Sequence, residues 1–172
     1  MHRKIAVCLI TLFLYGPNAW ANDRILAAIP QASIVGQGVL SIAFWDIYEA
    51  TLYATNGQWR DTQPAILSIE YFVTIDGADI ADRSVKEIRK QGFTDEVQLA
   101  AWNSQMKNIF PNVVPGSILS ATYFPYKETR FYSNGEPIGA IKGDMFGRLF
   151  FNIWLGENTS EPQLRQSLLG KS

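Results

Sequence analysis

The sequence contains very little cysteine or histidine. Of its 172 residues one is a cysteine, Cys8, and one is a histidine, His2, and both lie within the first 21 positions. A chain cleaved after residue 21 has no disulfide bond, no thiol nucleophile, no Ser-His-Asp triad and no zinc site that uses cysteine or histidine. We therefore expect neither a metal nor a cofactor.

The sequence also lacks a strong charge of either sign. It has 15 lysine and arginine residues against 16 aspartate and glutamate residues, a formal net charge of −1. Without residues 1–21, which include Arg3 and Lys4, the balance is 13 against 16, or −3. Nucleic-acid binding requires clustered basic residues, so we expect no nucleic-acid partner.

No apolar run is long enough to cross a membrane. The longest, residues 5–15, has 11 residues, whereas a spanning helix needs about 20. Basic residues precede this run, and Ala19-Trp20-Ala21 follows it with the small-x-small pattern of a signal peptidase site. We expect residues 1–21 to be a signal peptide cleaved after Ala21, with a retained anchor as the alternative. Residues 22–172 would then form one periplasmic or secreted domain with no membrane span.

The hydrophobic pattern predicts an α+β fold. Alternation of apolar and polar residues between turn signals predicts strands, and apolar residues at helical spacing predict helices. Thr94 and Ser160 are the expected caps of the second and the last helix. Asn134-Gly135 predicts a tight hairpin turn. Strands and helices are grouped rather than alternating, which favours an antiparallel sheet with helices packed on one face. The predicted strands are residues 34–54 (a pair), 67–75, 117–124, 130–132 and 137–141, and the predicted helices are residues 76–90, 99–110, 146–154 and a last one after 160.

Two motifs resemble ligand sites but have simpler explanations. Gly36-Gln37-Gly38 lacks the third glycine of a dinucleotide-binding loop and precedes a strand, which favours a strand bulge. The acidic residues Asp76, Asp79, Asp82 and Glu87 lack the spacing of a calcium loop, and their position at a helix start favours capping and helix-dipole interactions.

Aromatic residues make up 13% of the chain and fall largely on the predicted strands and helices. A bulky core is one explanation. The alternative is an apolar pocket between the sheet and the helices, in which tyrosine hydroxyls orient a ligand, because such pockets need only a few polar groups.

Several stretches carry a family resemblance when they are taken together. Residues 35–41 (VGQGVLS) and 47–53 (IYEATLY) resemble the glycine-rich first hairpin of the chalcone isomerase-like superfamily. Residues 84–88, 110–116, 130–135 and 150–155 resemble its bacterial exported branch. The resemblance implies an open-faced β-sandwich, which agrees with the predicted sheet and helices.

This superfamily contains plant isomerases that close a chalcone to a flavanone, and relatives that bind fatty acids. The resemblance implies that a functional arginine of both groups corresponds here to Leu40, and that a hydroxyl residue of the second strand corresponds to Tyr48. The helix tyrosine and asparagine of the isomerases fall near Ile80 and Glu87. Leucine cannot stabilise an enolate or hold a carboxylate. Arg83 is a candidate substitute, with an exposed surface arginine as the alternative.

We therefore predict a non-catalytic protein that binds a small apolar or amphipathic ligand, such as a fatty acid, at Leu40, Tyr48 and Arg83. A second hypothesis is an isomerase or lyase that acts on a phenolic or enone substrate through Tyr48. It requires a nearby cation to lower the pKa of Tyr48. A third is a protein-interaction module whose vestigial pocket is fully packed. The sequence does not indicate an oligomeric state.

Overall fold

The computed structural model describes residues 25–171, and the predicted signal peptide with its cleavage site lies outside them. The elements run in the following order: β1 (Ala32–Ile42), β2 (Trp45–Thr55), β3 (Ala65–Tyr71), α2 (Gly77–Lys90), α3 (Glu96–Ile109), β4 (Ile118–Phe124), β5 (Glu128–Ser133), β6 (Glu136–Lys142), α4 (Asp144–Leu155) and α5 (Pro162–Leu168).

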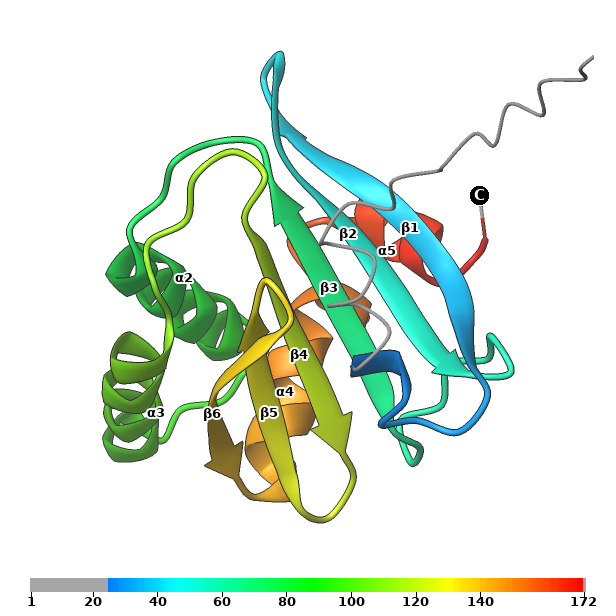
Figure 1. Ribbon diagram of the computed structural model, residues 1–172. Coiled ribbons are helices and arrows are strands. Elements are labelled where there is room, and N and C mark those ends of the chain that lie inside the picture. Colours follow the sequence, from blue (N-terminus) through cyan, green and yellow to red (C-terminus); the bar gives the residue numbers. More distant parts are fainter. Residues whose placement is uncertain (1–24, 172) are drawn as a thin grey trace, which may run out of the picture.

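The six strands form one antiparallel sheet in which each strand pairs with the next one in the sequence (Figure 1). Helix α4 packs on β4, β5 and β6, and α5 packs on β1 and β2. Helix α2 contacts both α3 and α4. The α+β class, the antiparallel sheet and the helices on one face were all predicted from the sequence, and the structure confirms them.

The core lies between the sheet and these helices and is rich in aromatic side chains. Phe146 on α4 is 1% exposed, and its ring lies 5.5 Å from Trp102, 6.2 Å from Phe131 and 5.5 Å from Phe150. Rings at these separations stabilise the core through edge-to-face and stacking contacts, in addition to the stabilisation from burying their apolar area. The core therefore accounts for the nine buried aromatic side chains among residues 25–171, and the remaining aromatic residues of this range are half-buried or exposed.

Strand β3 is shorter than predicted. The alternating pattern suggested a strand up to Ile75, but β3 ends at Tyr71. The next N–H, that of Phe72, still bonds the carbonyl of Ile47 on β2, and the chain then turns away from the sheet. Ile75 pairs only with Val113, in an isolated bridge. Phe72 is therefore exposed, and Val73 and Ile75 are only half-buried, because the sheet no longer covers this segment.

Both predicted helix caps were wrong. Helix α3 is capped by Asp95 rather than Thr94, and the Asp95 carboxylate accepts a 3.0 Å hydrogen bond from the Gln98 N–H. An aspartate at this position also interacts favourably with the helix dipole. Helix α5 follows Glu161 rather than Ser160. The Ser160 hydroxyl instead donates a hydrogen bond to a carboxylate on α2.

The predicted hairpin turn at Asn134-Gly135 is confirmed. The two residues have φ angles of 48° and 86° and join β5 directly to β6. Positive φ at both central positions is what a type I′ turn requires, and asparagine and glycine tolerate it best.

The two outer strands of the sheet are both irregular. The β1–β2 register shifts between Ile34 and Gly36, as the glycine motif predicted, and the β5–β6 register shifts where β6 runs from Pro137 to Gly139. Gly36 also lies against α5, where an added Cβ would sit 2.1 Å from the carbonyl oxygen of Ser167. Glycine is therefore required for the close approach of α5 to β1.

Candidate ligand-binding site

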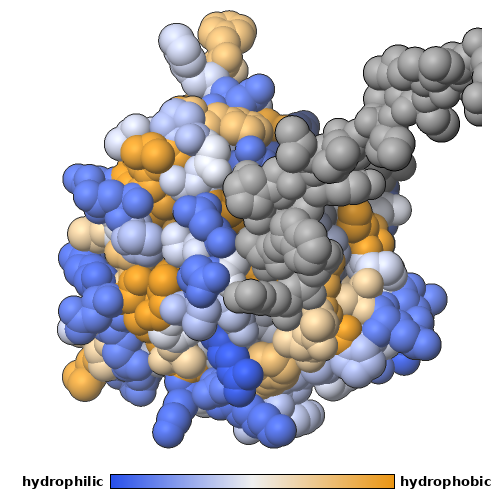
Figure 2. Space-filling model, in the orientation of Figure 1, coloured by the Kyte–Doolittle hydropathy of each residue, from blue (hydrophilic) through white to orange (hydrophobic). Residues whose placement is uncertain are grey.

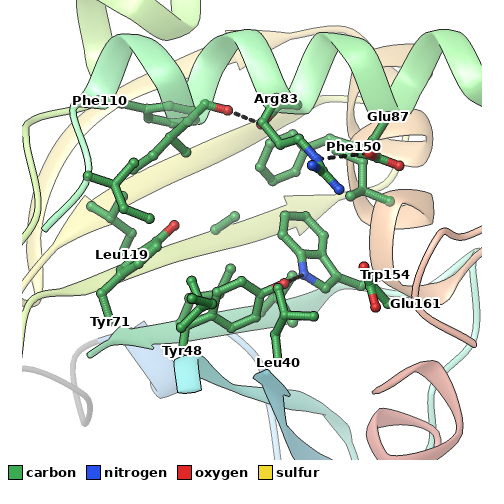
Figure 3. A pocket seen from close by; sticks show the side chains of 18 of the residues that line it. Leu40, Tyr48, Tyr71, Arg83, Glu87, Phe110, Leu119, Phe150, Trp154 and Glu161 are labelled. Atoms are coloured by element: carbon green, nitrogen blue, oxygen red, sulfur yellow. Dashed lines mark hydrogen bonds and ion pairs between the residues drawn. The ribbon is translucent and has the colours of Figure 1, made fainter. Parts of the chain in front are cut away.

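A cavity of about 360 Å³ lies between the sheet and helices α2 and α4 (Figure 3). This volume lies within the range of about 300–1,000 Å³ that is typical of small-molecule sites. The wall is mostly aliphatic and aromatic, with contributions from β1, β2, β3, β4, α2, α4 and the segment before α5. Its lining includes Leu40, Tyr48, Tyr71, Ile80, Arg83, Glu87, Phe150, Trp154 and Glu161.

The structure brings the three sequence-predicted site residues together around this cavity. Leu40 and Tyr48 are direct partners in the β1–β2 pairing, and Arg83 reaches the cavity from α2. Figure 3 shows Arg83 on the opposite side of the cavity from Tyr48. That these side chains contact a ligand stays a prediction.

Tyr48 is fixed by a contact that the sequence does not reveal. Its hydroxyl oxygen accepts a 2.9 Å hydrogen bond from the indole Nε1–H of Trp154, which links β2 to α4. Burial raises the pKa of Tyr48 to about 12, although the Trp154 hydrogen bond partly opposes this. The phenol is consequently neutral near pH 7, and its own proton can be donated to a ligand.

Tyr71 is a second tyrosine of the cavity wall, and our sequence interpretation did not single it out. Its side chain is 5% exposed, and its ring packs edge-on against Tyr48 at 5.8 Å. Within residues 25–171 no hydrogen-bond partner is seen for its hydroxyl. Burial raises the pKa of this phenol as well. A hydroxyl with no protein partner beside an apolar cavity is a natural contact for the polar end of a ligand.

Arg83 is engaged in an ion-pair network. Its Nε lies 2.8 Å from Glu87 Oε1, and the same oxygen lies 3.0 Å from Lys90 Nζ. Ser160 donates a hydrogen bond to the other carboxylate oxygen. The Arg83 side chain is 56% exposed, whereas that of Glu87 is 7% exposed. A ligand anion would have to compete with Glu87 for the Arg83 guanidinium.

Comparison with known proteins identifies the family of this chain. A family model described as chalcone isomerase-like matches residues 23–170. The chain belongs to the chalcone isomerase-like family. An uncharacterized protein of Haemophilus influenzae is 28% identical over 171 residues, which cover 99% of this chain and 78% of that protein. The family-model match confirms the resemblance to the chalcone isomerase-like superfamily that the sequence motifs indicated.

A solved structure with the same fold is the fatty-acid binding protein of Arabidopsis thaliana. It superposes with a TM-score of 0.62 and 13% sequence identity, covering 81% of this chain and 87% of the plant protein. At this level of identity the similarity supports the chalcone isomerase-like fold.

The surroundings of Tyr48 do not supply the pKa shift that the enzyme hypothesis requires. That hypothesis required a cation that lowers the pKa of Tyr48, but burial is the largest influence and raises it. The Arg83 charge lowers the pKa, but it contributes less than burial, the Trp154 hydrogen bond and the Glu161 charge. The hypothesis of a fully packed, vestigial pocket is opposed by the cavity itself.

The acidic residues at the start of α2 differ in their contacts, and the capping hydrogen bond expected there is not formed by Asp76. Asp76 occupies the N-cap position without a capping side-chain hydrogen bond, and Asn112 Oδ1 accepts from the Gly77 N–H instead. Asp82 lies 2.8 Å from Lys107 Nζ. In the part of the chain that the structure describes, no three acidic, histidine or cysteine side chains are grouped closely enough to hold a metal ion.

The Glu87 network predicts a pH dependence of stability. Burial by itself raises the pKa of Glu87, but the Ser160 and Lys90 hydrogen bonds and the Arg83 charge outweigh it and place the pKa below the usual 4.5. A carboxyl with a lower pKa in the folded state stabilises the fold above the unfolded-state pKa, and this contribution disappears as the pH falls through the folded-state pKa. We expect the stability advantage of the wild type over Glu87→Gln to be full at pH 7 and to shrink below about pH 4.5.

Urea unfolding of both proteins between pH 7 and pH 3 measures this difference. Arg83→Gln, which removes one partner instead of the carboxylate, should weaken the pH dependence without abolishing it. A difference between wild type and Glu87→Gln that stays constant over the whole range would contradict the prediction.

Proposed function

We propose that this chalcone isomerase-like protein binds a small apolar or amphipathic ligand, such as a fatty acid, and does not convert it chemically. The observation that carries the proposal is a pair of adjacent tyrosines, the half-buried Tyr48 and the buried Tyr71, beside a 360 Å³ apolar cavity. The cavity would bury the apolar part of the ligand, and the two phenols would donate hydrogen bonds to its polar end. Arg83 is the proposed charge partner.

We also propose that the protein belongs to an exported bacterial branch of the family and acts in the periplasm or outside the cell. The basic, apolar and small-residue segments of residues 1–21 support this location. Within residues 25–171 no helix is long and apolar enough to cross a membrane. Fractionation followed by mass measurement tests the location, and a mature chain starting at Asn22 in the periplasmic or secreted fraction is the expected result.

Native mass spectrometry of the protein purified from its host is the direct test of the binding function. A stoichiometric lipid or aromatic adduct, released on denaturation, is the expected result. For protein stripped of ligand, dodecanoate should displace a neutral fluorescent probe such as N-phenyl-1-naphthylamine. Protein that carries no adduct and binds neither the probe nor dodecanoate would overturn the proposal.

Tyr71→Phe should separate ligand binding from stability. The change removes a hydroxyl that has no hydrogen-bond partner among the described residues but leaves the ring in place, so the free energy of unfolding should not fall. The affinity for dodecanoate should fall by about fivefold to tenfold, because one hydrogen bond contributes about 1 kcal/mol. Displacement titrations measure the affinity, with Tyr126→Phe, a change at an exposed residue, as the control. An unchanged affinity would contradict a role for Tyr71.

A further inference from the structure

The turn between β1 and β2 carries an exposed apolar tip. Ala43 and Phe44 connect the last residue of β1, Ile42, to the first residue of β2, Trp45. Phe44 is 99% exposed, Trp45 is 74% exposed and Ile42 is 58% exposed. Figure 1 shows this hairpin extending past the neighbouring loops, and Figure 2 shows a light orange group and a pale blue one projecting above the rest of the surface there. We refer to Ile42, Phe44 and Trp45 as the hairpin tip.

The exposure of these residues is not explained by packing inside the chain. Neither Phe44 nor Trp45 makes an aromatic contact with any described residue. The other three described tryptophans all contact aromatic or phenolic groups: Trp59 stacks on Phe151, and Trp102 and Trp154 contact rings of the core. Adjacent large apolar side chains that are fully hydrated are unfavourable, and such groups commonly mark an interaction site.

The hairpin tip is continuous with the cavity. Ile42 belongs to the tip and also lines the cavity, and Ile47, two residues beyond the tip, does the same. Phe72, which is 38% exposed, is joined to Ile47 by a backbone hydrogen bond. An apolar path therefore runs from the tip to the cavity wall.

We propose that the hairpin tip inserts into the surface of a lipid bilayer and places the cavity next to the membrane. Tryptophan and other aromatic side chains are enriched at membrane–water interfaces, where an apolar ring and a polar edge are both accommodated. The narrow tip offers about 150–250 Å² from each aromatic ring, which is less than the roughly 800 Å² per partner in a standard protein interface. A projecting point fits a fluid layer that closes around it better than a rigid protein surface.

The charges around the tip specify the kind of membrane. No lysine or arginine occurs between Ile25 and Trp59, so the hairpin offers no cation to anionic lipids. Asp46 adjoins the tip and accepts a 2.6 Å hydrogen bond from the Ser41 hydroxyl. Attraction to anionic lipids depends on basic residues near the surface and is weakened by salt. Docking by insertion alone should not require anionic lipid and should persist in high salt.

Vesicle flotation with the full mature protein tests the proposal. Wild-type protein should float with vesicles of pure phosphatidylcholine, and at least as well as with vesicles that contain phosphatidylglycerol. The double variant Phe44→Ser, Trp45→Ser should partition at least about tenfold less. Tyr126→Ser removes an aromatic residue that is 75% exposed in the β4–β5 turn, at the opposite end of the sheet, and should leave flotation unchanged.

Three results would overturn membrane docking. The first is wild-type protein that fails to float with phosphatidylcholine. The second is equal flotation of the double variant, provided that near-ultraviolet circular dichroism shows both proteins folded. The third is a wild-type dimer that becomes a monomer in the double variant, which would make the tip a contact between copies. The flotation experiment uses no added cavity ligand, so it tests the hairpin tip separately from ligand binding. A protein that docks on vesicles but binds no ligand would overturn the proposed function and leave membrane docking intact.

Discussion

Replacing Phe146 by alanine is expected to lower the free energy of unfolding by about 3–5 kcal/mol. Phe146 is 1% exposed and contacts Trp102, Phe131 and Phe150, so it joins α3, β5 and α4 in one aromatic cluster. Removing the ring loses its transfer free energy and leaves a cavity that three large rings cannot fill by small shifts. Urea unfolding followed by circular dichroism measures the change.

Phe44→Ala is the matched control for this substitution. It removes the same ring from a side chain that is 99% exposed, so the free energy of unfolding should change by less than about 0.5 kcal/mol. A large loss for Phe44→Ala, or a small one for Phe146→Ala, would show that the core is not organised around α4 as described.

Ile80→Trp is expected to weaken ligand binding by at least about tenfold. Ile80 is a half-buried residue of α2 that lines the cavity. An indole at this position would extend into the space that the ligand needs. Because the cavity itself accepts the larger ring, the substitution should block binding without the strain that overpacking causes in a filled core. Titration with N-phenyl-1-naphthylamine measures the affinity.

Ala78→Trp provides the control on the same helix. Ala78 is exposed and is not part of the cavity wall, so a tryptophan there adds the same side chain to the outside of α2. Its affinity for the probe should equal that of the wild type. Equal affinities for Ile80→Trp and the wild type would place the binding site elsewhere in the molecule.

Local signals account for the parts of the fold that were predicted well. Asn134-Gly135 specifies its turn through backbone conformation alone, and the helix from Gly77 to Lys90 ends where Gly92 follows. Both signals act within a few residues of the feature that they determine. The cap at Asp95 was missed because Thr94 and Asp95 are both good capping residues, and only the hydrogen bond to the Gln98 N–H distinguishes them.

The candidate site was less predictable because its contacts join distant parts of the chain. Tyr48 meets Trp154 from another element, and Ser160 meets Glu87 from a position 73 residues away. Family resemblance indicated Leu40 and Tyr48, while Tyr71 was hidden in a strand pattern that also fits a core residue. Whether an aromatic side chain faces a cavity or the filled core depends on the packing of the whole domain.

The irregular outer strands have a consequence for how this protein behaves at high concentration. An open sheet leaves unpaired N–H and C=O groups on its first and last strands, and these can add strands from another molecule. Here β1 is bent by a bulge and lies against α5, while β6 carries Pro137 and an irregular register. Bulges and proline at sheet edges block continuation of the ladder. The fold therefore protects its edges against aggregation while leaving the hairpin tip free.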